Sequence, residues 1–357
     1  MKTIYHFLRL IRLTNLLVIG LTMVVVEMFL LGYKSPNFIP VYQDYSVYDS
    51  FMFNVNTSTD QISGFLFLHI KHFILLIFST LLIAAAGNII NDYFDVKADR
   101  INKPNRLIIG KHIKRRWAMV LHWSFNSIGM IIALYVGYEL QNIWVPLIAF
   151  LSINLLWFYS TYYKRKPLVG NLIVALLIGI VPIYVLLFNM PIIDFEIHLH
   201  SKLFIIAKSY LIDVVLLISG IAFLQNLVRE LVKDIQDVRG DLKLGAKTFP
   251  IKYGIKKTKY LIVSISITTL LLMAFYLIYI FNFDFNTKGA TMGNGIDLST
   301  VTSFNFNYFR LFLLLSAILY SSAIIFIILF NKSKTYKTAS TLLKIAMLFG
   351  LLTPLFL

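Results

Sequence analysis

Apolar residues along this chain fall into repeated long runs that are separated by shorter polar segments. Each run holds about 18 to 22 residues, the length that a helix needs to cross a hydrocarbon layer about 30 Å thick. The runs lack the alternation of apolar and polar residues that membrane β-barrel strands show. The pattern therefore predicts an all-α, polytopic membrane protein with about nine transmembrane helices. The spans are expected near residues 15–33, 67–91, 117–138, 144–161, 169–188, 209–230, 259–281, 308–330 and 340–357.

The composition agrees with this pattern. Hydrophobic residues make up 58% of the 357 positions and charged residues only 14%, which is more apolar surface than a soluble core of this length needs. No repeat, low-complexity tract or soluble domain interrupts the runs, so residues 1–357 are interpreted as one membrane domain. Insertions on its outer face are expected at 34–66, 189–207 and 283–307. The chain has no cysteine, which excludes disulfides, thiolate metal sites and cysteine nucleophiles.

Lysine and arginine gather in alternate connecting segments. They are dense at 100–116, 164–166, 229–259 and 332–337 and sparse in the three longer segments that are assigned to the outer face. The positive-inside rule places the basic segments and the N-terminus in the cytoplasm. No small-residue cleavage site follows the first span, so we expect it to be retained. The net charge of +16 lies mostly on one face, which favours anionic headgroups or an anionic substrate over nucleic acid.

The sequence NDYFDVKADRINKPNR at 91–106 places acidic residues at the end of the second span. If the helix continues, Asn91, Asp95 and Asp99 share one face, with Asp92 close by. Like charges repel at this spacing, and Mg²⁺ is the natural partner because it prefers oxygen ligands and completes its shell with water and phosphates. Zinc is disfavoured, since no histidine or cysteine accompanies the carboxylates. A solvated helix end is the alternative, and it fits a single aspartate better than a cluster in register.

A second cluster lies at the end of the sixth span, in QNLVRELVKDIQDVRGDLKLGAKTFP at 225–250. Its polar residues recur at helical spacing, with Arg229 and Lys233 on neighbouring faces, and Gly245 is expected to end the helix. Two facing carboxylate clusters would hold two or more Mg²⁺ ions around one diphosphate. Lys247 is either a phosphate partner or an ordinary loop charge. The members of the cluster are Asn226, Glu230, Asp234, Asp237 and Asp241.

The two motifs together resemble the paired aspartate-rich motifs of the UbiA superfamily of intramembrane prenyltransferases. The superfamily pattern is N-D-x-x-D-x-x-x-D and D-x-x-x-D, followed by a glycine and a basic residue. YSTYYKRKPLVGNLIVA, after the fourth span, is also similar to the family, and most of residues 1–282 follow its pattern. Within the superfamily, the second motif is similar to that of the archaeal-type digeranylgeranylglyceryl phosphate synthases. That closer similarity is carried by Arg229, Glu230, Lys233, Asp234, Gly240 and Asp241.

The resemblance implies helices around a central cavity and a set of site residues. One Mg²⁺ would be held by Asn91, Asp95 and Asp99 and another by Asp237 and Asp241, with Asp92 and Asp234 as auxiliary ligands. Among these, Asp95, Asp99, Asp237 and Asp241 would be catalytic, and Tyr159 would lie near the reacting carbon. RLIRLTN resembles the family's Arg-Pro-x-Asn, with Leu13 in place of the proline. The residues expected to bind substrate are Arg12, Asn15, Arg106, Lys164, Arg165, Asn171 and Lys247.

The implied activity is transfer of a prenyl group from an isoprenyl diphosphate to a lipophilic acceptor. The first expectation for the acceptor is an alcohol of the geranylgeranylglyceryl phosphate type, and the alternative is an aromatic ring such as 4-hydroxybenzoate. A transporter is a remote alternative, because transporters place acidic residues near the bilayer midplane. We expect membrane lipids but no nucleic acid or obligate protein partner. The protein would lie in the cytoplasmic or inner membrane of a prokaryote, with its site on the cytoplasmic side.

Overall fold

The computed structural model describes residues 2–30, 59–102, 107–199, 202–243, 245–287, 305–330 and 333–357. These residues form helices and no sheet, and nine of the helices are long and apolar enough to cross a membrane. The predicted all-α class and number of spans are confirmed for this part of the chain. The helices are α2 (Leu13–Leu30), α3 (Thr59–Asn102), α4 (Arg115–Glu139), α5 (Trp144–Thr161), α6 (Val169–Leu199), α7 (Lys202–Lys243), α9 (Ile255–Thr287), α10 (Phe306–Leu329) and α11 (Ser333–Leu351).

The described parts of the proposed outer insertions are largely helical. Helix α3 begins at Thr59, α6 continues to Leu199 and α9 continues to Thr287, so each extends beyond its apolar span. The physical reason is that a change from apolar to polar residues marks where lipid ends, whereas a helix ends only where its backbone turns. Residues 34–58 and 288–304 lie outside the described residues, and the assignment of these segments as insertions stays a prediction.

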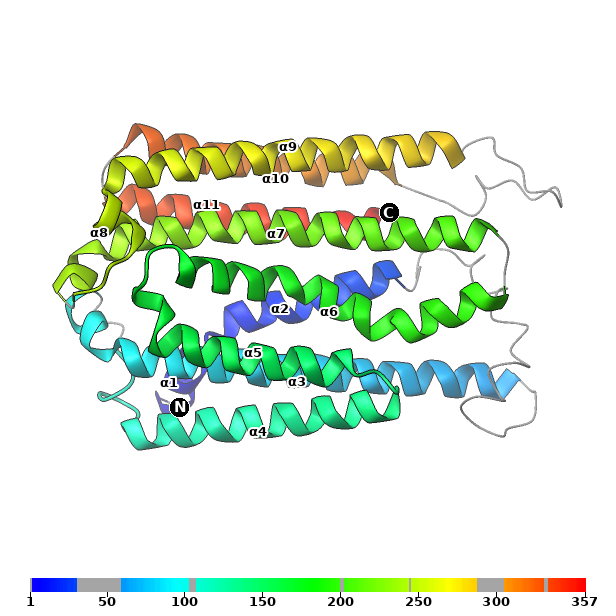
Figure 1. Ribbon diagram of the computed structural model, residues 1–357, viewed down its shortest axis with the longest axis horizontal. Helices are drawn as coiled ribbons and strands as arrows, with labels where there is room; N and C mark the ends of the chain where they lie inside the picture. Colours follow the sequence, from blue (N-terminus) through cyan, green and yellow to red (C-terminus); the bar gives the residue numbers. More distant parts are fainter. Residues whose placement is uncertain are drawn as a thin grey trace.

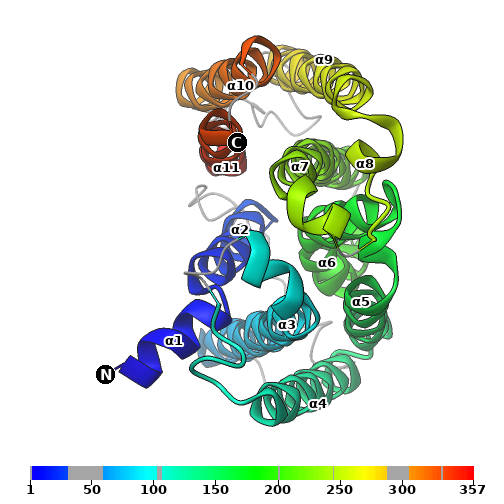
Figure 2. The ribbon, with the colours of Figure 1, turned by 90° about the vertical axis from the view of Figure 1, so that its left-hand side faces the viewer.

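The long helices run roughly alongside one another (Figure 1). Viewed along the helices, they form an incomplete ring that begins at α2 and returns through α9, α10 and α11 to the neighbourhood of α2 (Figure 2). Helix α7 packs against α3, α6, α9 and α11, so it contacts both halves of the ring. The short elements are α1 (Lys2–Leu10), α8 (Phe249–Tyr253) and the turns η4 (Tyr163–Arg165) and η6 (Thr353–Phe356).

Small residues allow neighbouring helices to approach closely. A Cβ at Gly129 of α4 would lie 2.9 Å from the Ile83 side chain and 3.2 Å from the Ser79 carbonyl oxygen of α3. Ser79 Oγ uses this approach to donate a 2.7 Å hydrogen bond to the Gly129 carbonyl oxygen. In lipid, where water does not drive helices together, such close packing and interhelical hydrogen bonding hold the bundle together.

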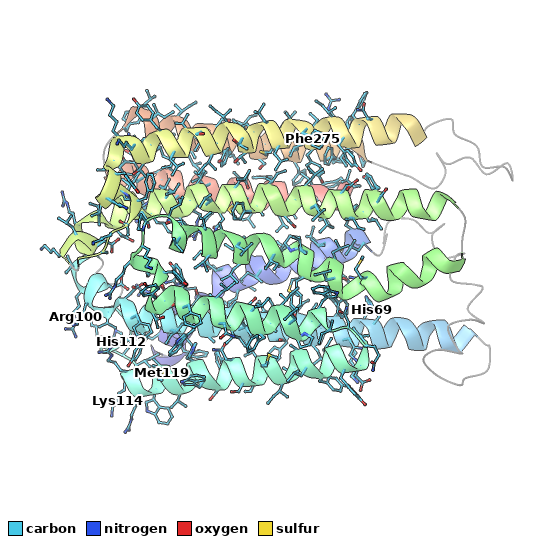
Figure 3. The ribbon with its side chains drawn as sticks, viewed as in Figure 1. His69, Arg100, His112, Lys114, Met119 and Phe275 are labelled. Atoms are coloured by element: carbon cyan, nitrogen blue, oxygen red, sulfur yellow. The ribbon has the colours of Figure 1, made fainter. Side chains whose placement is uncertain are left out.

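A buried polar network joins three helices of the bundle. Glu27 of α2 and His69 of α3 are each only 4% exposed, and His69 Nε2 lies 2.6 Å from Glu27 Oε1. Asn189 Nδ2 of α6 donates a 2.7 Å hydrogen bond to the other carboxylate oxygen of Glu27. His69 lies well away from the end that carries Arg100, His112 and Lys114 (Figure 3). The network therefore ties α2, α3 and α6 together at the end of the bundle opposite the basic residues.

Candidate active site

A cavity of about 1330 Å³ lies inside the ring of helices. Its wall takes residues from α1, α2, α3, α5, α6, α7, α9, α10 and α11, so most of the described bundle contributes to it. The two acidic motifs, which are far apart in sequence, line this single cavity from α3 and α7, which pack against each other. The predicted metal ligands in its wall are Asn91, Asp92, Asp95, Asp99, Asp234, Asp237 and Asp241.

The first acidic motif has the helical register that its spacing predicts. Helix α3 continues to Asn102, which places Asn91, Asp95 and Asp99 on one face, and all three line the cavity. Lys164 Nζ donates a 2.8 Å hydrogen bond to Asn91 Oδ1 and also donates to the Asp95 carboxylate. The motif is therefore already in contact with a basic group that belongs to a different part of the sequence.

Lys164 reaches the motif from η4, the short turn after α5. Gly170 at the start of α6 lets this turn approach, because a Cβ there would lie 3.0 Å from Lys164 Cα and 3.1 Å from the Tyr163 carbonyl oxygen. Burial alone would lower the pKa of Lys164, but the neighbouring Asp95 carboxylate outweighs burial and leaves that pKa above its ordinary value. Lys164 therefore carries a positive charge at neutral pH.

Arg12 reaches the same motif from the junction of α1 and α2. It joins α1 to α2 in the left-handed backbone region, with φ of +55°, which is uncommon for a residue other than glycine. Arg12 Nη2 donates a 2.6 Å hydrogen bond to Asp92 Oδ1. Burial opposes the charge of Arg12, but Asp92 outweighs burial and keeps the pKa of Arg12 raised. The strained junction thus aims a permanent cation into the cavity.

The second acidic motif lies on α7, which continues to Lys243 as the spacing predicts. Gly245 follows the helix with φ of +68°, a conformation that favours glycine and ends the helix as expected. Asn171 Nδ2 of α6 donates a 2.9 Å hydrogen bond to Asp234 Oδ2. The predicted substrate residue Asn171 therefore lines the cavity and orients an acidic side chain of the motif.

Arg229 and Lys233 also line the cavity. The sequence spacing puts them on helix faces next to the acidic residues, so it did not predict this position. Glu230 accepts a 3.2 Å hydrogen bond from Arg229 Nη1 and another from Lys233 Nζ. Arg229 Nη1 donates as well to Asn226 Oδ1, at 3.1 Å. Long basic side chains reach around a helix, so a neighbouring position is close enough to enter a cavity. This part of α7 therefore presents two cations and one carboxylate.

The remaining predicted site residues, which include Tyr159 as a catalytic residue, divide into three cases. Asn15, Arg165 and Tyr159 line the cavity, and Lys164 Nζ lies 5.9 Å from the centroid of the Tyr159 ring. Lys247 is exposed and does not line the cavity, although its backbone N–H donates to the Arg165 carbonyl oxygen at 2.9 Å, so the structure favours the loop-charge interpretation. Arg106 lies outside the described residues.

Two other polar residues within the spans have structural partners. His122 is buried, with its ring Nδ1 3.0 Å from the Ala86 carbonyl oxygen, which places it in the contact between α4 and α3. Asp213 accepts a 2.7 Å hydrogen bond from Tyr279 and does not line the cavity. Neither residue belongs to the candidate site.

Tyr5, Arg9 and Lys344 are among the cavity-lining residues that the sequence motifs did not indicate. Tyr5 and Arg9 come from α1, whose signal was a short amphipathic pattern before the first span. Lys344 comes from α11, and its signal was a single basic residue inside an apolar run, which usually marks a functional position in a membrane.

The site residues suit Mg²⁺ in the presence of a phosphorylated substrate. Within the described ranges, no three acidic or histidine side chains form a group able to hold a metal ion. A closed protein cage is not required, because Mg²⁺ commonly binds one or two carboxylates and takes its other ligands from substrate phosphates and water. The cavity offers carboxylates from α3 and α7 together with the cations Arg12, Lys164 and Arg165. This combination of oxygen ligands and basic groups fits a metal–diphosphate complex.

Two curated relatives align with part of the chain. It is 33% identical over 202 residues to the digeranylgeranylglyceryl phosphate synthase of Thermococcus sibiricus, covering 57% of this chain and 63% of that protein. It is 35% identical over 208 residues to the same synthase of Methanobrevibacter smithii, covering 56% of this chain and 65% of that protein. The aligned stretch is thus less than two thirds of the length of these relatives.

Solved structures share the fold over nearly the whole chain. A structure concerning digeranylgeranylglyceryl phosphate synthase in membranes matches with a TM-score of 0.59 and 22% identity, covering 99% of this chain and 98% of that one. A UbiA homologue from Archaeoglobus fulgidus bound to GPP and Mg²⁺ matches with a TM-score of 0.51 and 15% identity, covering 98% and 99% of the two chains. The model of the UbiA prenyltransferase family matches residues 62–349, which include both acidic motifs and the helices between them. The chain belongs to the UbiA prenyltransferase family.

Proposed function

We propose that this protein catalyses the Mg²⁺-dependent transfer of a prenyl group from an isoprenyl diphosphate to the free hydroxyl of a prenylglyceryl phosphate. The observation that carries this proposal is the single cavity into which both acidic motifs and a set of basic side chains project. The curated relatives that carry the name digeranylgeranylglyceryl phosphate synthase support this choice of acceptor. The A. fulgidus structure with GPP and Mg²⁺ supports the choice of cofactor.

In this proposal the acidic motifs position the diphosphate and the basic residues stabilise its departure. Asp95 and Asp99 on α3 face the cavity, as do Asp237 and Asp241 on α7. Bound Mg²⁺ would neutralise charge on the diphosphate and so assist its departure. Arg12, Lys164 and Arg165 stabilise the negative charge that develops on the leaving oxygens. Such stabilisation is effective because the cations are held in place before the reaction begins.

The prenyl group then passes to the acceptor. The bond between the allylic carbon and the diphosphate oxygen breaks, and its electron pair leaves with the diphosphate. An oxygen lone pair of the acceptor forms the new carbon–oxygen ether bond, and the hydroxyl proton is released. The Tyr159 ring lies beside Lys164 in the cavity wall and would face the electron-poor carbon. Attraction between a cation and an aromatic face is worth about 2 kcal/mol in a desolvated site.

The apolar part of the cavity suits the prenyl chain. Ile148, Val181 and Ile218 line it, and Met273 and Leu313 extend this surface onto α9 and α10. The acidic motifs lie at the ends of α3 and α7 that precede the basic connecting segments. By the positive-inside rule, the reaction would take place at the cytoplasmic side of the membrane, with the N-terminus on that side.

The proposal is tested with purified protein, Mg²⁺ and geranylgeranyl diphosphate. Geranylgeranylglyceryl phosphate and 4-hydroxybenzoate are offered as competing acceptors, and products are identified by mass. We expect an ether lipid that retains the phosphate. A ring-prenylated product would instead support the aromatic acceptor, and the absence of both products would overturn the proposed acceptor class.

A further inference from the structure

We infer that the cavity contains a second anion subsite, formed by Asn226 and Arg229 of α7 with Lys344 of α11, that binds the phosphate group of the acceptor. This inference rests on the proposed function and adds to it the residues that select a phosphorylated acceptor. The residues expected to grip the diphosphate are different ones, namely Arg12, Lys164 and Arg165.

Two buried donors of α7 lack partners within the protein. Asn226 is 0% exposed and lines the cavity, and its Nδ2 has no hydrogen-bond partner. Arg229 is 8% exposed and also lines the cavity, and its Nε has no partner. Asn226 Oδ1 accepts from Arg229 Nη1, which directs the Asn226 amide N–H₂ away from that contact. Buried polar groups are nearly always hydrogen-bonded, so donors that remain unpaired in a cavity wall indicate a ligand with acceptor atoms.

The charges near these donors indicate that the ligand is an anion. Glu230 receives hydrogen bonds from Arg229 and Lys233, so one carboxylate is shared between two cations. Among Arg229, Glu230 and Lys233 the balance is therefore positive, and the unpaired buried atoms of Asn226 and Arg229 are donors. A phosphate monoester carries only acceptor oxygens and about two negative charges at neutral pH, so it satisfies both features.

Lys344 lies in the cavity wall at the same depth as Arg229. Gln236 Nε2 of α7 donates a 2.9 Å hydrogen bond to the Tyr336 carbonyl oxygen of α11, which aligns the two helices at that level. The helices pack together and run in opposite directions (Figure 1). From this level, Lys344 and Arg229 are each displaced by about 10 to 12 Å in the same direction along the bundle, at 1.5 Å per residue. Lys344 therefore adds a basic group to the cavity wall beside α7, at the level of the buried donors.

The subsite is also close enough to the diphosphate site to serve one reaction. Arg229 and Glu230 line the same cavity as Arg12 and the first acidic motif, and α7 packs against α3, so the Arg229–Glu230 region shares one cavity with that motif. A phosphate held there would leave the neighbouring hydroxyl of a glyceryl phosphate directed toward the allylic carbon. An acceptor without a phosphate would leave the Asn226 and Arg229 donors without a ligand, which disfavours its binding.

The test compares Lys344→Met and Asn226→Asp with the wild-type protein. Lys344→Met removes one cation, and Asn226→Asp keeps an acceptor for Arg229 while replacing the unpaired donor with a carboxylate oxygen. Lys337→Met is the matched control, because Lys337 is an exposed lysine of the same helix that does not line the cavity. Lys344→Arg tests whether a different cation at this position can replace lysine. For each protein, kcat/KM is measured with geranylgeranylglyceryl phosphate and with the corresponding alcohol that lacks the phosphate.

We expect Lys344→Met and Asn226→Asp to lower kcat/KM for the phosphorylated acceptor by about 10- to 100-fold, as loss of a hydrogen bond to a charged group predicts. The KM for geranylgeranyl diphosphate and the activity on the unphosphorylated alcohol should change little. Lys344→Arg and Lys337→Met should retain the preference for phosphate. Wild-type preference in both Lys344→Met and Asn226→Asp would overturn the subsite.

Binding of geranylgeranylglyceryl phosphate without Mg²⁺ or diphosphate separates this inference from the proposed function. We expect wild-type protein to bind this acceptor more tightly than its unphosphorylated alcohol and Lys344→Met to lose the difference. That result would support the subsite even if no transfer were observed, whereas failed transfer alone would count against the proposed function. Equal affinity of the wild-type protein for both compounds would overturn the subsite, and so would tighter binding of 4-hydroxybenzoate.

Discussion

The Lys164 ammonium group donates a hydrogen bond to the Asp95 carboxylate, and this contact joins the turn after α5 to the first acidic motif. The family resemblance implied different roles for the two residues, with Lys164 binding the substrate and Asp95 holding a metal ion. Their contact shows that the two groups lie within reach of the same ligand. A metal–diphosphate complex would provide each group with an opposite charge, Mg²⁺ for Asp95 and phosphate oxygens for Lys164.

Replacing Lys164 with methionine should weaken use of the diphosphate substrate. We expect kcat/KM for the isoprenyl diphosphate to fall by about 10-fold or more, because a hydrogen bond to a charged group is lost. The raised pKa of Lys164 keeps the wild-type residue protonated up to pH 9. We therefore expect that deprotonation of Lys164 does not lower kcat/KM at any pH below 9. Steady-state kinetics from pH 6 to 9 check both statements.

Lys166→Met is the matched control for this change. Lys166 belongs to the same connecting segment, but its Nζ lies 3.8 Å from the centroid of the Tyr162 ring and it does not line the cavity. Activity lost equally in the two variants would mean that the segment tolerates no lysine replacement, and the assignment of Lys164 to the diphosphate would then fail.

The acidic motifs should be required for metal-dependent binding as well as for turnover. We expect Asp95→Asn and Asp237→Asn to lower transfer by at least about 100-fold, since even residues that only support metal ligands contribute 10- to 100-fold. Calorimetry should show that each variant binds an unreactive isoprenyl diphosphate analogue more weakly in Mg²⁺. Chelation with EDTA should abolish wild-type binding of the analogue, and added Mg²⁺ should restore it.

Asp213→Asn provides the control for the acidic variants. It makes the same chemical change on α7, at a residue that accepts a hydrogen bond from Tyr279 and does not line the cavity. We expect its metal-dependent binding to match that of the wild-type protein. Analogue binding that is insensitive to EDTA, or normal in both Asp95→Asn and Asp237→Asn, would refute the proposed metal site.

The membrane spans and the shared helical faces of the acidic residues could be predicted, because each depends on residues near one another in sequence. A run of about 20 apolar residues satisfies the length requirement of the bilayer, and a spacing of four places Asn91 and Asp95 on one helical face. The prediction that α3 continues past Asn91 was correct, and α7 likewise continues through Asp241. These features require no knowledge of how the helices pack.

The other parts of the site depend on contacts between distant segments. Lys344 is more than a hundred residues from Arg229 in sequence, and only the packing of α11 against α7 places the two residues in one cavity wall. The same limit applies to Arg12 and Asp92, whose contact requires the turn between α1 and α2. Conversely, Lys247 follows the second motif closely in sequence, yet the chain turns after α7 and leaves its side chain outside the cavity.

Acidic pH should loosen the packing of α1 on the segment that precedes α4. The His6 and His112 rings are stacked with centroids 3.6 Å apart. The pKa of His112 is lowered from 6.5 by desolvation and by nearby His6, Lys111 and Arg9. Because the folded form favours neutral His112, the contact is most stable above pH 6.5 and weakens as pH falls through the lowered pKa.

Hydrogen exchange of residues 2–10 between pH 7.5 and 5 would measure this loosening. Rates must be corrected for the intrinsic dependence of exchange on pH. We expect protection of α1 to fall in the wild-type protein and to change much less in His112→Phe, which keeps an aromatic ring but cannot be protonated. An identical fall in both proteins would show that His112 does not control the contact.

The buried Glu27 network should stabilise the fold without contributing to transfer. Glu27→Leu removes the acceptor that His69 and Asn189 share, and breaking a buried polar network of this kind costs about 3 kcal/mol. Glu27→Gln retains a hydrogen-bonding side chain and should cost about 1 kcal/mol. Reversible unfolding in detergent would measure both values, and activity per folded molecule should remain unchanged because none of the three residues lines the cavity. If Glu27→Leu were as stable as the wild-type protein, the network would not stabilise the bundle, and a loss of activity in the folded variant would instead connect this end of α2 to the site.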